Sequence, residues 1–552
     1  CPIMNTNRFS LPALALLALT VPCAAQSWVP TSAPGFGAPW NTLIDSQLFD
    51  DDLWVATENP LNGAEIWRTD GLTAWTASST GGFGDFENRA IVSSEVFGGN
   101  LVVLTRNWST GSEVWSFDGA NWSQTNADGF GDANNEDGAL FALGGTLYAV
   151  SHNYATGCAV HRFNGGSSWT TIGAAGLGNP DNYEVNLELF GGSLYAGTSN
   201  FGDGGEVRRS VSGPAGTRVV PGSGFDSSGS DNEYASVRAY GGTLYAGTYN
   251  EFTGTELWEY LGGTSWAQRN VDGFGDPNNI EIGGVAEFGG ALYLGTISTI
   301  LAGGEVWRFD GGSTFVQVGA AGFGNPANGA VPVLAEHSGA LYASTYNFNS
   351  GTEIWRYDAA ATWTRIDPGA PGPGGGGFGD PSNVLALFAT LNGELHAVLP
   401  SVVWRMQAGS VGGTICAPGT PNMSGGPGRI LASGRLLVAA NDLTLTAESL
   451  PQNSFGFFIV ARSAAGSVVP PASVGILCLS GPIGRYVGPG EVMNSGTAGT
   501  FTLPLDLTRV PQPTGFVSAA AGDTWNFQAW HRDVAGGIVV SNFTEGLSVT
   551  LQ

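Results

Sequence analysis

The chain has 552 residues, of which 46 are acidic and 20 are basic, with no lysine and a formal net charge of −26. A chain this acidic repels the phosphates of nucleic acids and anionic lipids, so we exclude nucleic-acid binding. Its 86 glycines stand at turns between short strand-like runs rather than in low-complexity tracts, which predicts a folded all-β protein.

The first 25 residues have the pattern of an export signal. Met4 is the expected start, Arg8 supplies a positive charge, and an apolar run leads to the small residues Cys23 to Ala25. No later stretch is apolar for the roughly 18 residues that a membrane-spanning helix needs. We therefore expect an exported protein, secreted or at the cell surface, without a membrane span.

A repeated unit fills residues 26–408. Its marker is the leucine of a Leu-Tyr-Ala-Gly-Thr strand, which recurs in steps of 46 to 54 residues at Leu53, Leu101, Leu147, Leu194, Leu244, Leu292, Leu341 and Leu395. Each unit contains four short runs rich in Val, Ile, Tyr and Trp, separated by Gly, Asn and Asp, which predict four antiparallel strands. Repeats of this kind are typical of propellers, and the absence of a helical period argues against a helical solenoid. We predict an eight-bladed β-propeller.

The two ends of the array predict how the ring closes. The last unit has no fourth strand after Trp404, whereas the segment Ser27-Trp28-Val29 resembles the fourth-strand opening Thr362-Trp363-Thr364. We expect residues 27–33 to supply the outer strand of the last blade, which leaves no open sheet edge. Seven blades with a degenerate linker are the alternative.

Short phrases between the third and fourth strands resemble known propeller families. The segments 117–122 and 309–315, which begin Phe-Asp-Gly, resemble the Asp-box hairpin of sialidases and related glycosidases, and Gly-Gly before an aromatic strand resembles Kelch blades. The Asp-box resemblance implies a structural turn away from any catalytic face. A sialidase also needs an arginine triad, whereas four of the 20 arginines here recur at one repeat position after Trp: Arg68, Arg308, Arg356 and Arg405.

The rest of the chain predicts a second domain. A Gly-rich linker covers 409–428, and alternating runs over 429–552 predict a β-sandwich. Cys416 and Cys478 could form a disulfide in an oxidising compartment. The phrases at 478–486, 523–533 and 541–544 resemble a tail domain of large secreted proteins of environmental bacteria. The resemblance implies export and extracytoplasmic placement, and no activity is carried over from it.

The loops after the second strands and the connections between units are expected on one face of the ring. A Gly-x-Glu motif recurs in these loops at Glu65, Glu113, Glu206, Glu256, Glu305 and Glu353, and aspartates recur in the connections at Asp85, Asp132, Asp276 and Asp380. One interpretation makes these acids structural, as partners of loop backbone and formers of Asx turns. The other makes them oxygen ligands for Ca²⁺, although no EF-hand spacing occurs.

The same loops carry an aromatic residue after a recurring asparagine. The five residues are Trp108, Tyr154, Phe201, Phe252 and Phe348. Rings at exposed loop tips are suited to stacking on the faces of sugars or on other apolar ligands. The alternative is that the rings fold down and fill gaps between blades.

The third unit departs most from the repeat. It has His152, Cys158 and His161 where other units carry Glu and Trp. Histidine and cysteine suit Zn²⁺ or copper, but Cys158 and His161 are three apart on a predicted strand and so point to opposite faces. A metal site would therefore use His152 and His161, and Cys158 is expected to pack as a small apolar group.

These patterns favour a secreted, non-catalytic protein that binds an extracellular polysaccharide or surface protein on the loop face, with Ca²⁺ as a candidate cofactor. The alternatives are a polysaccharide-active lyase or glycoside hydrolase that uses the same face, and a purely structural surface protein. No Gly-x-Ser-x-Gly, P-loop or His-Glu-x-x-His motif occurs in the chain.

Overall fold

The computed structural model describes residues 27–551 apart from 72–73, 210–215, 221–223, 226–231, 300–301, 358–361, 370–374, 408–410, 417–418, 435, 437, 439–440 and 442. The expected export signal lies outside the described residues. Two compact units divide the chain: the ring unit, Ser27–Gln407, and the tail unit, which contains Ala408–Gln552. None of the helices in the described part of the chain has the length and apolar character of a membrane span.

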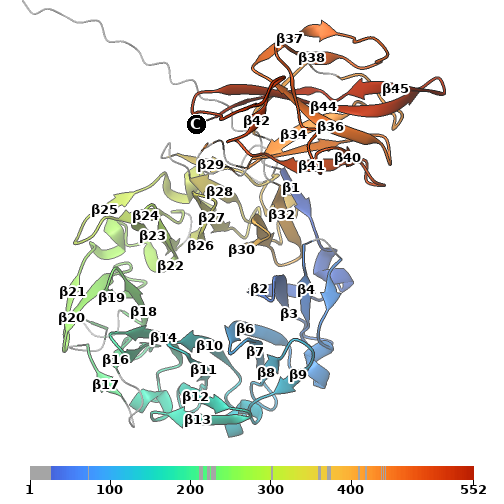
Figure 1. The fold of residues 1–552 in the computed structure, drawn as a ribbon. Helices are drawn as coiled ribbons and strands as arrows, with labels where there is room; N and C mark the ends of the chain where they lie inside the picture. The colour runs from blue at the N-terminus through green and yellow to red at the C-terminus, as the bar shows by residue number, and fades with distance from the viewer. Residues whose placement is uncertain are drawn as a thin grey trace, which may run out of the picture. The chain divides into compact units, whose positions relative to one another are not determined.

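The ring unit is a propeller-like series of four-stranded antiparallel repeats. The first four repeats consist of β2 to β5 (Thr42–Phe49, Asp52–Glu58, Ile66–Thr69, Thr76–Ala77), β6 to β9 (Ala90–Phe97, Asn100–Arg106, Val114–Phe117, Trp122–Gln124), β10 to β13 (Asp137–Leu143, Thr146–His152, Ala159–Gly165, Ser168–Ile172) and β14 to β17 (Glu184–Phe190, Ser193–Ser199, Val207–Arg209, Thr217–Arg218). Figure 1 shows the first strand of each repeat, here called the inner strand, toward the centre of the ring.

The later repeats continue the series around the ring. They consist of β18 to β21 (Tyr234–Tyr240, Thr243–Tyr249, Leu257–Gly262, Ser265–Gln268), β22 to β25 (Asn279–Phe288, Ala291–Ser298, Val306–Phe309, Phe315–Gln317), β26 to β29 (Ala330–His337, Ala340–Tyr346, Ile354–Tyr357, Trp363–Arg365) and β30 to β32 (Leu387–Leu391, Glu394–Val398, Val403–Gln407), completed by β1 (Ser27–Pro30).

The Gly-Phe-Gly phrase makes a tight turn that enters each new repeat. In the second of these turns Gly82 and Phe83 both have positive φ, 55° and 58°, a backbone conformation that is unusual for phenylalanine. The Phe83 ring stacks on Trp115 with centroids 4.7 Å apart and planes 8° apart. The same stack recurs as Phe36 on Trp67, Phe274 on Trp307 and Phe323 on Trp355. The aromatic stack therefore holds the strained turn against the third strand of the next repeat.

The expected closure of the ring is confirmed. Strand β1 pairs antiparallel with β32, so that Trp28 lies opposite Met406 and Val29 opposite Arg405. The Trp28 side chain is buried, and its indole N–H donates to the carbonyl oxygen of Ile366 at 2.8 Å. The first strand of the ring unit thus completes the sheet of its last repeat and covers the edge that β32 would otherwise expose.

The tail unit contains a seven-stranded and a three-stranded sheet. The first consists of β33 (Gly413–Ile415), β46 (Gly546–Thr550), β44 (Thr524–Ala535), β36 (Phe455–Ala461), β39 (Gly484–Arg485), β40 (Met493–Asn494) and β45 (Ile538–Phe543), and the second of β34 (Arg429–Ser433), β35 (Thr444–Glu448) and β41 (Phe501–Pro504). Two short hairpins add β37 (Ser463–Val468) with β38 (Leu477–Ser480) and β42 (Val510–Pro511) with β43 (Phe516–Val517).

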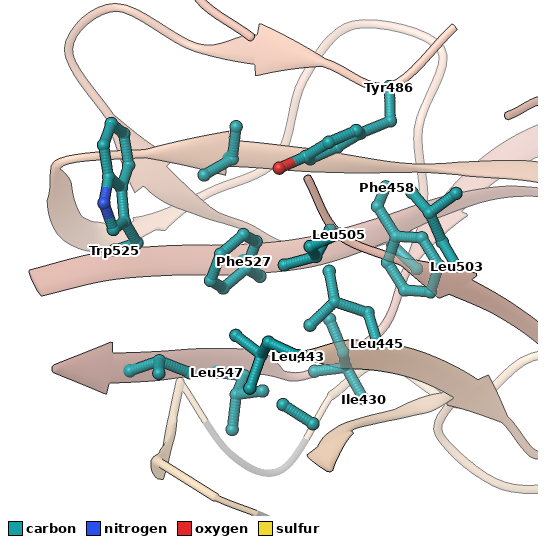
Figure 2. Packing of buried hydrophobic residues seen from close by; sticks show 14 of the residues in the cluster. Ile430, Leu443, Leu445, Phe458, Tyr486, Leu503, Leu505, Trp525, Phe527 and Leu547 are labelled. Atoms are coloured by element: carbon teal, nitrogen blue, oxygen red, sulfur yellow. The ribbon is translucent and has the colours of Figure 1, made fainter. Parts of the chain in front are cut away.

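Both larger sheets contribute to one apolar core in the tail unit. Leu445 and Leu503 from the three-stranded sheet belong to the same buried cluster as Phe458 and Phe527 from the other sheet, and Figure 2 shows these side chains converging. The expected disulfide is confirmed, because Cys416 and Cys478 are bonded with their Cα atoms 6.0 Å apart.

Candidate ligand-binding face

In six of the repeats the loop after the second strand is built on one buried asparagine. In the second repeat, the Asn107 Oδ1 accepts hydrogen bonds from the backbone N–H groups of Ser109 and Thr110 at 2.9 and 3.0 Å. The Asn107 Nδ2 donates to the Oδ1 of Asn88, in the connection between repeats, at 3.1 Å. Equivalent asparagines are Asn59, Asn153, Asn200, Asn250 and Asn347. Each of these loops is therefore tied to the connection beside it.

The recurring glutamates face the interior of this network. The Glu113 Oε2 accepts hydrogen bonds from the Asn88 Nδ2 at 2.8 Å and from the Trp115 indole N–H at 2.7 Å. Burial raises the pKa of the Glu113 carboxyl, an effect that these two hydrogen bonds oppose. Glu65, Glu256 and Glu353 make the same pair of contacts in their own repeats.

The sequence predicted these glutamates as ligand-binding residues, and their contacts correct this prediction. Glu113, Glu256 and Glu353 are buried, with 2% of Glu353 exposed, and Glu65 is half-buried. A carboxylate that is buried and bonded to two neighbours inside the ring is not presented to an external ligand. The structural interpretation is the one that the contacts support, and these residues are left out of the face proposed below.

The aspartates of the connections form Asx turns. Oδ1 of Asp85 accepts from the N–H of Glu87, and Oδ1 of Asp132 accepts from the N–H of Asn134, each at 3.0 Å. The hydrogen bond from the Asn134 backbone lowers the pKa of Asp132. Within the described ranges no group of three or more His, Cys, Asp or Glu side chains is placed to hold a metal ion. Calcium support of this face stays a prediction.

The third repeat uses His161 for packing. The imidazole takes the place of the repeat tryptophan and stacks on Phe130, with centroids 3.8 Å apart and planes 3° apart. Its Nε2 lies 3.0 Å from the Ser151 hydroxyl and its Nδ1 lies 3.0 Å from the Thr171 hydroxyl. Burial lowers the pKa of His161 to about 3, so the ring is neutral at physiological pH.

These contacts correct the expected metal pair. Both ring nitrogens of His161 are engaged by hydroxyl groups, and Ala149 is its partner across the sheet. His152 is three residues from Ala149 on the same strand and points to the opposite side of the sheet. Cys158 is free and fully buried, and burial raises the pKa of its thiol to about 12. His161 and Cys158, which distinguish the third repeat from the others, therefore have a packing role.

The five loop aromatics are exposed, in contrast to the glutamates beside them. The exposed fraction is 53% for Trp108, 67% for Tyr154 and 73% for Phe348, and Phe201 and Phe252 lie between these limits. The guanidinium of Arg89 lies 5.5 Å from the centre of the Trp108 ring. These rings do not fill gaps between repeats, as the alternative interpretation required.

A row of three rings crosses the third and fourth repeats. The Tyr154 and Tyr183 centroids are 5.7 Å apart, and those of Tyr183 and Phe201 are 6.3 Å apart, with planes inclined by 36° and 30°. Tyr183 was not predicted from the sequence, and the signal that identifies it is an aromatic residue directly after the connection asparagine. Phe86 and Trp40, in other connections, are also exposed.

Acidic residues stand near the centre of the same face. Burial raises the pKa of the Tyr154 hydroxyl, and the negative charges of Glu184 and Asp137 add to this effect. Burial and then the charge of Glu184 raise the pKa of Glu281, and both glutamates contribute, after burial, to a raised pKa of Tyr234. The face therefore combines exposed aromatic rings with carboxylates. These carboxylates occupy repeat positions at which other units carry different residues.

The fold is that of an all-β, propeller-like protein. No family model and no curated protein matches the chain. Among solved structures it is similar to Sqt1 from Chaetomium thermophilum bound to the N-terminus of the ribosomal protein L10, at 12% identity and a TM-score of 0.48, over 68% of this chain and 99% of that one.

Two further similarities concern enzymes. One is to a structure from a study of two prolyl endopeptidases, at 11% identity and a TM-score of 0.40, where the match covers 75% of this chain and only 55% of that one. The other is to an α-L-arabinofuranosidase from Clostridium thermocellum, at 15% identity and a TM-score of 0.25, over 41% and 92% of the two chains. At these scores neither similarity carries an argument about ligand or activity.

Proposed function

We propose that the ring unit is an eight-bladed β-propeller whose loop face binds an extracellular glycan without catalysis, in a secreted protein whose tail is a β-sandwich. One observation carries this proposal: five aromatic rings of the loops after the second strands, four directly after the loop asparagine and Phe252 one residue later, are each more than half exposed. Exposed aromatic groups in a contiguous set mark binding surfaces, and their faces stack on the C–H faces of sugars.

The loop network supports a binding role for these rings. Asn250 holds its loop by accepting from the N–H of Phe252 at 2.9 Å and from the N–H of Thr253 at 2.9 Å. Because the backbone under Phe252 is already ordered, less conformational entropy is lost when a ligand immobilises the ring. The row of Tyr154, Tyr183 and Phe201 provides an extended contact that suits a chain of sugars better than a single sugar.

The test is retention on polysaccharide. We expect the triple substitution of Trp108, Phe252 and Phe348 by Ala to weaken binding to an insoluble polysaccharide by about ten- to a thousandfold, since each stack is worth roughly 0.5–1.5 kcal/mol. The matched control is Leu261→Ala, which removes an exposed apolar side chain near the end of β20. Equal retention of the triple variant and the control contradicts the proposal.

A second candidate is a polysaccharide-active enzyme, which the central carboxylates favour. A carboxyl group whose pKa is raised by burial and by a neighbouring carboxylate is typical of acid–base sites. Burial and then the charge of Glu184 raise the pKa of Glu281 in this way, and both glutamates add to the effect of burial on Tyr234. Release of reducing ends or unsaturated sugars that Glu281→Gln abolishes would support this function. If neither retention nor release is found across a polysaccharide panel, a structural surface protein is the remaining candidate.

A further inference from the structure

The inner strand of the sixth repeat is irregular. Strand β22 has ten residues, whereas its neighbours β18 and β26 have seven and eight. Its pairing with β23 shifts register twice, between Asn279 and Glu281 and between Ile282 and Gly284. Bulges of this kind move a strand away from its regular path and are frequent next to functional sites. The irregular strand faces the fifth repeat.

Two ways of filling the space between consecutive repeats recur elsewhere in the ring. At one position of the second strand, buried Leu104, Val150 and Val398 pack against the next repeat. Where the residue is glycine, the next inner strand comes close instead: a Cβ on Gly197 would lie 2.0 Å from the Ala235 carbonyl oxygen, and one on Gly295 would lie 2.2 Å from that of Val331.

Neither device fills the space between the fifth and sixth repeats. The equivalent residue is Gly247, and the nearest atom to a Cβ built there is the Cδ1 of the Ile282 side chain at 3.5 Å. A hollow of about 470 Å³ includes this space and extends along the inner strands of neighbouring repeats, from Phe141 of β10 to Pro332 and Leu334 of β26. Its size is within the range of small-molecule sites. Its deep wall is apolar and comes from Gly247, Leu257, Ile282, Val285, Leu292 and Leu294.

The mouth of the hollow is polar and lies on the inner strands. Asn186, Glu188, Ser236 and Arg238 line it from β14 and β18. The Asn186 Oδ1 accepts from the N–H of Val237 at 2.9 Å, which leaves its Nδ2 to donate outwards. One oxygen of Glu188 accepts from the N–H of the adjacent Leu189 at 3.1 Å. Hydrogen-bond donors therefore stand between the hollow and the centre of the ring.

Arg238 gives this mouth its charge. It is the one lysine or arginine on the inner strands β2, β6, β10, β14, β18, β22, β26 and β30 as they are described. Its side chain is exposed and makes no ion pair with an acid in the described part of the chain. A guanidinium without an acidic partner, in a chain with a net charge of −26, is suited to a forked interaction with a carboxylate.

We propose that the hollow between the fifth and sixth repeats binds a small organic carboxylate with an apolar body. The apolar body occupies the wall formed by Leu257, Leu292 and Leu294, and the carboxylate accepts hydrogen bonds from Arg238 and the Asn186 amide. This site is separate from the loop aromatics, since none of those five residues lines it. Binding of the carboxylate in the hollow is therefore independent of the binding of polysaccharide by the loop aromatics.

The experiment uses two probes of one shape on the full chain. Calorimetry measures the binding of 2-naphthylacetate and of its neutral analogue 2-naphthylacetamide. We expect the acid to bind at least tenfold more tightly than the amide, and Arg238→Gln to remove this preference while leaving the amide unchanged. Glu188→Gln is expected to tighten binding of the acid, because it removes a negative charge from the mouth.

Filling the hollow provides the matched test. Gly247→Val introduces the side chain that Val150 and Val398 carry at the same position, and it is expected to abolish binding of both probes while the protein keeps its melting temperature. If Gly247→Val fails to fold, Leu294→Phe fills the same space from the other side. Binding that survives both variants, equal affinity for acid and amide, or no binding of the acid at millimolar concentration overturns the proposal.

Discussion

The ring unit and the tail unit bury their apolar side chains in different ways. The ring divides its interior into small clusters between neighbouring repeats, such as the one formed by Leu257, Leu292, Leu294 and Phe309. The tail concentrates 21 buried residues in one cluster. A divided core lets one repeat depart from the pattern without disturbing the others, which explains how the third repeat holds His161 and the fifth holds a hollow beside Gly247.

The largest expected effect concerns the tail core. Phe527 is almost fully buried at its centre, and Phe527→Ala is expected to cost about 3–5 kcal/mol of the free energy of unfolding. Differential scanning calorimetry should show a lowered transition for the tail and an unchanged one for the ring. A single transition in the unaltered protein, or equal shifts of two, contradicts the division into independent units.

A smaller effect is expected when the polar network of the ring is cut. Asn107→Ala removes the acceptor for two loop N–H groups and leaves Asn88 without one partner, at a cost of about 1–3 kcal/mol. Hydrogen exchange at Ser109 and Thr110 should accelerate, while the corresponding amides of the fifth-repeat loop keep their protection. The control is Asn164→Ala, an exposed asparagine of the same unit, which should leave both loops unchanged.

Within the ring, the contribution of His161 to the free energy of unfolding depends on pH. His161 stays neutral in the folded protein down to about pH 3, whereas in the unfolded chain it binds a proton below about pH 6.5. Its contribution to the free energy of unfolding is therefore constant above that pH and decreases as the pH falls from there toward 3. Denaturation at several pH values should show that the free energy of unfolding of the unaltered protein, relative to that of His161→Phe, falls as the pH is lowered from about 6.5 toward 3.

The smallest expected effect is that the Cys158 thiol does not react in the folded protein. Burial raises the pKa of the Cys158 thiol to about 12, so almost no thiolate is present at pH 8 and the residue should not react with Ellman's reagent in the folded protein. In a chain without residues 1–25, which include Cys1 and Cys23, one equivalent of thiol should appear in denaturant, because Cys416 and Cys478 are paired. Rapid labelling in the native state would show that the third repeat opens on its own.

The features that repeat were predictable from the sequence. The spacing of the marker leucines predicted the array of strands, and the resemblance of the segment around Trp28 to a fourth strand predicted its pairing with β32. The cysteine pair of the tail was also expected. In each case the prediction came from comparing a segment or residue with its equivalent in another repeat, or with its partner, in the same chain.

The chemistry of single side chains was less predictable. Spacing did not show that Glu113 points inward, because its partner Asn88 belongs to the preceding connection. His161 suggested a metal ligand by its type, although aligning it with Trp115 in the previous repeat would have indicated a stacking role. The hollow beside Gly247 depends on two bulges in β22, and register shifts leave no pattern in a single sequence.

The pairing of Trp28 with Met406 has a consequence for how the chain folds. The outer strand of the last repeat is synthesised before any other part of the ring, and its partner emerges only after all the other repeats. Strand β1 therefore stays unpaired through most of translation. The pairing of two segments so distant in sequence is a slow, late step of folding. A polypeptide interrupted before Val403 would keep an open edge at each end and would be prone to associate with other chains.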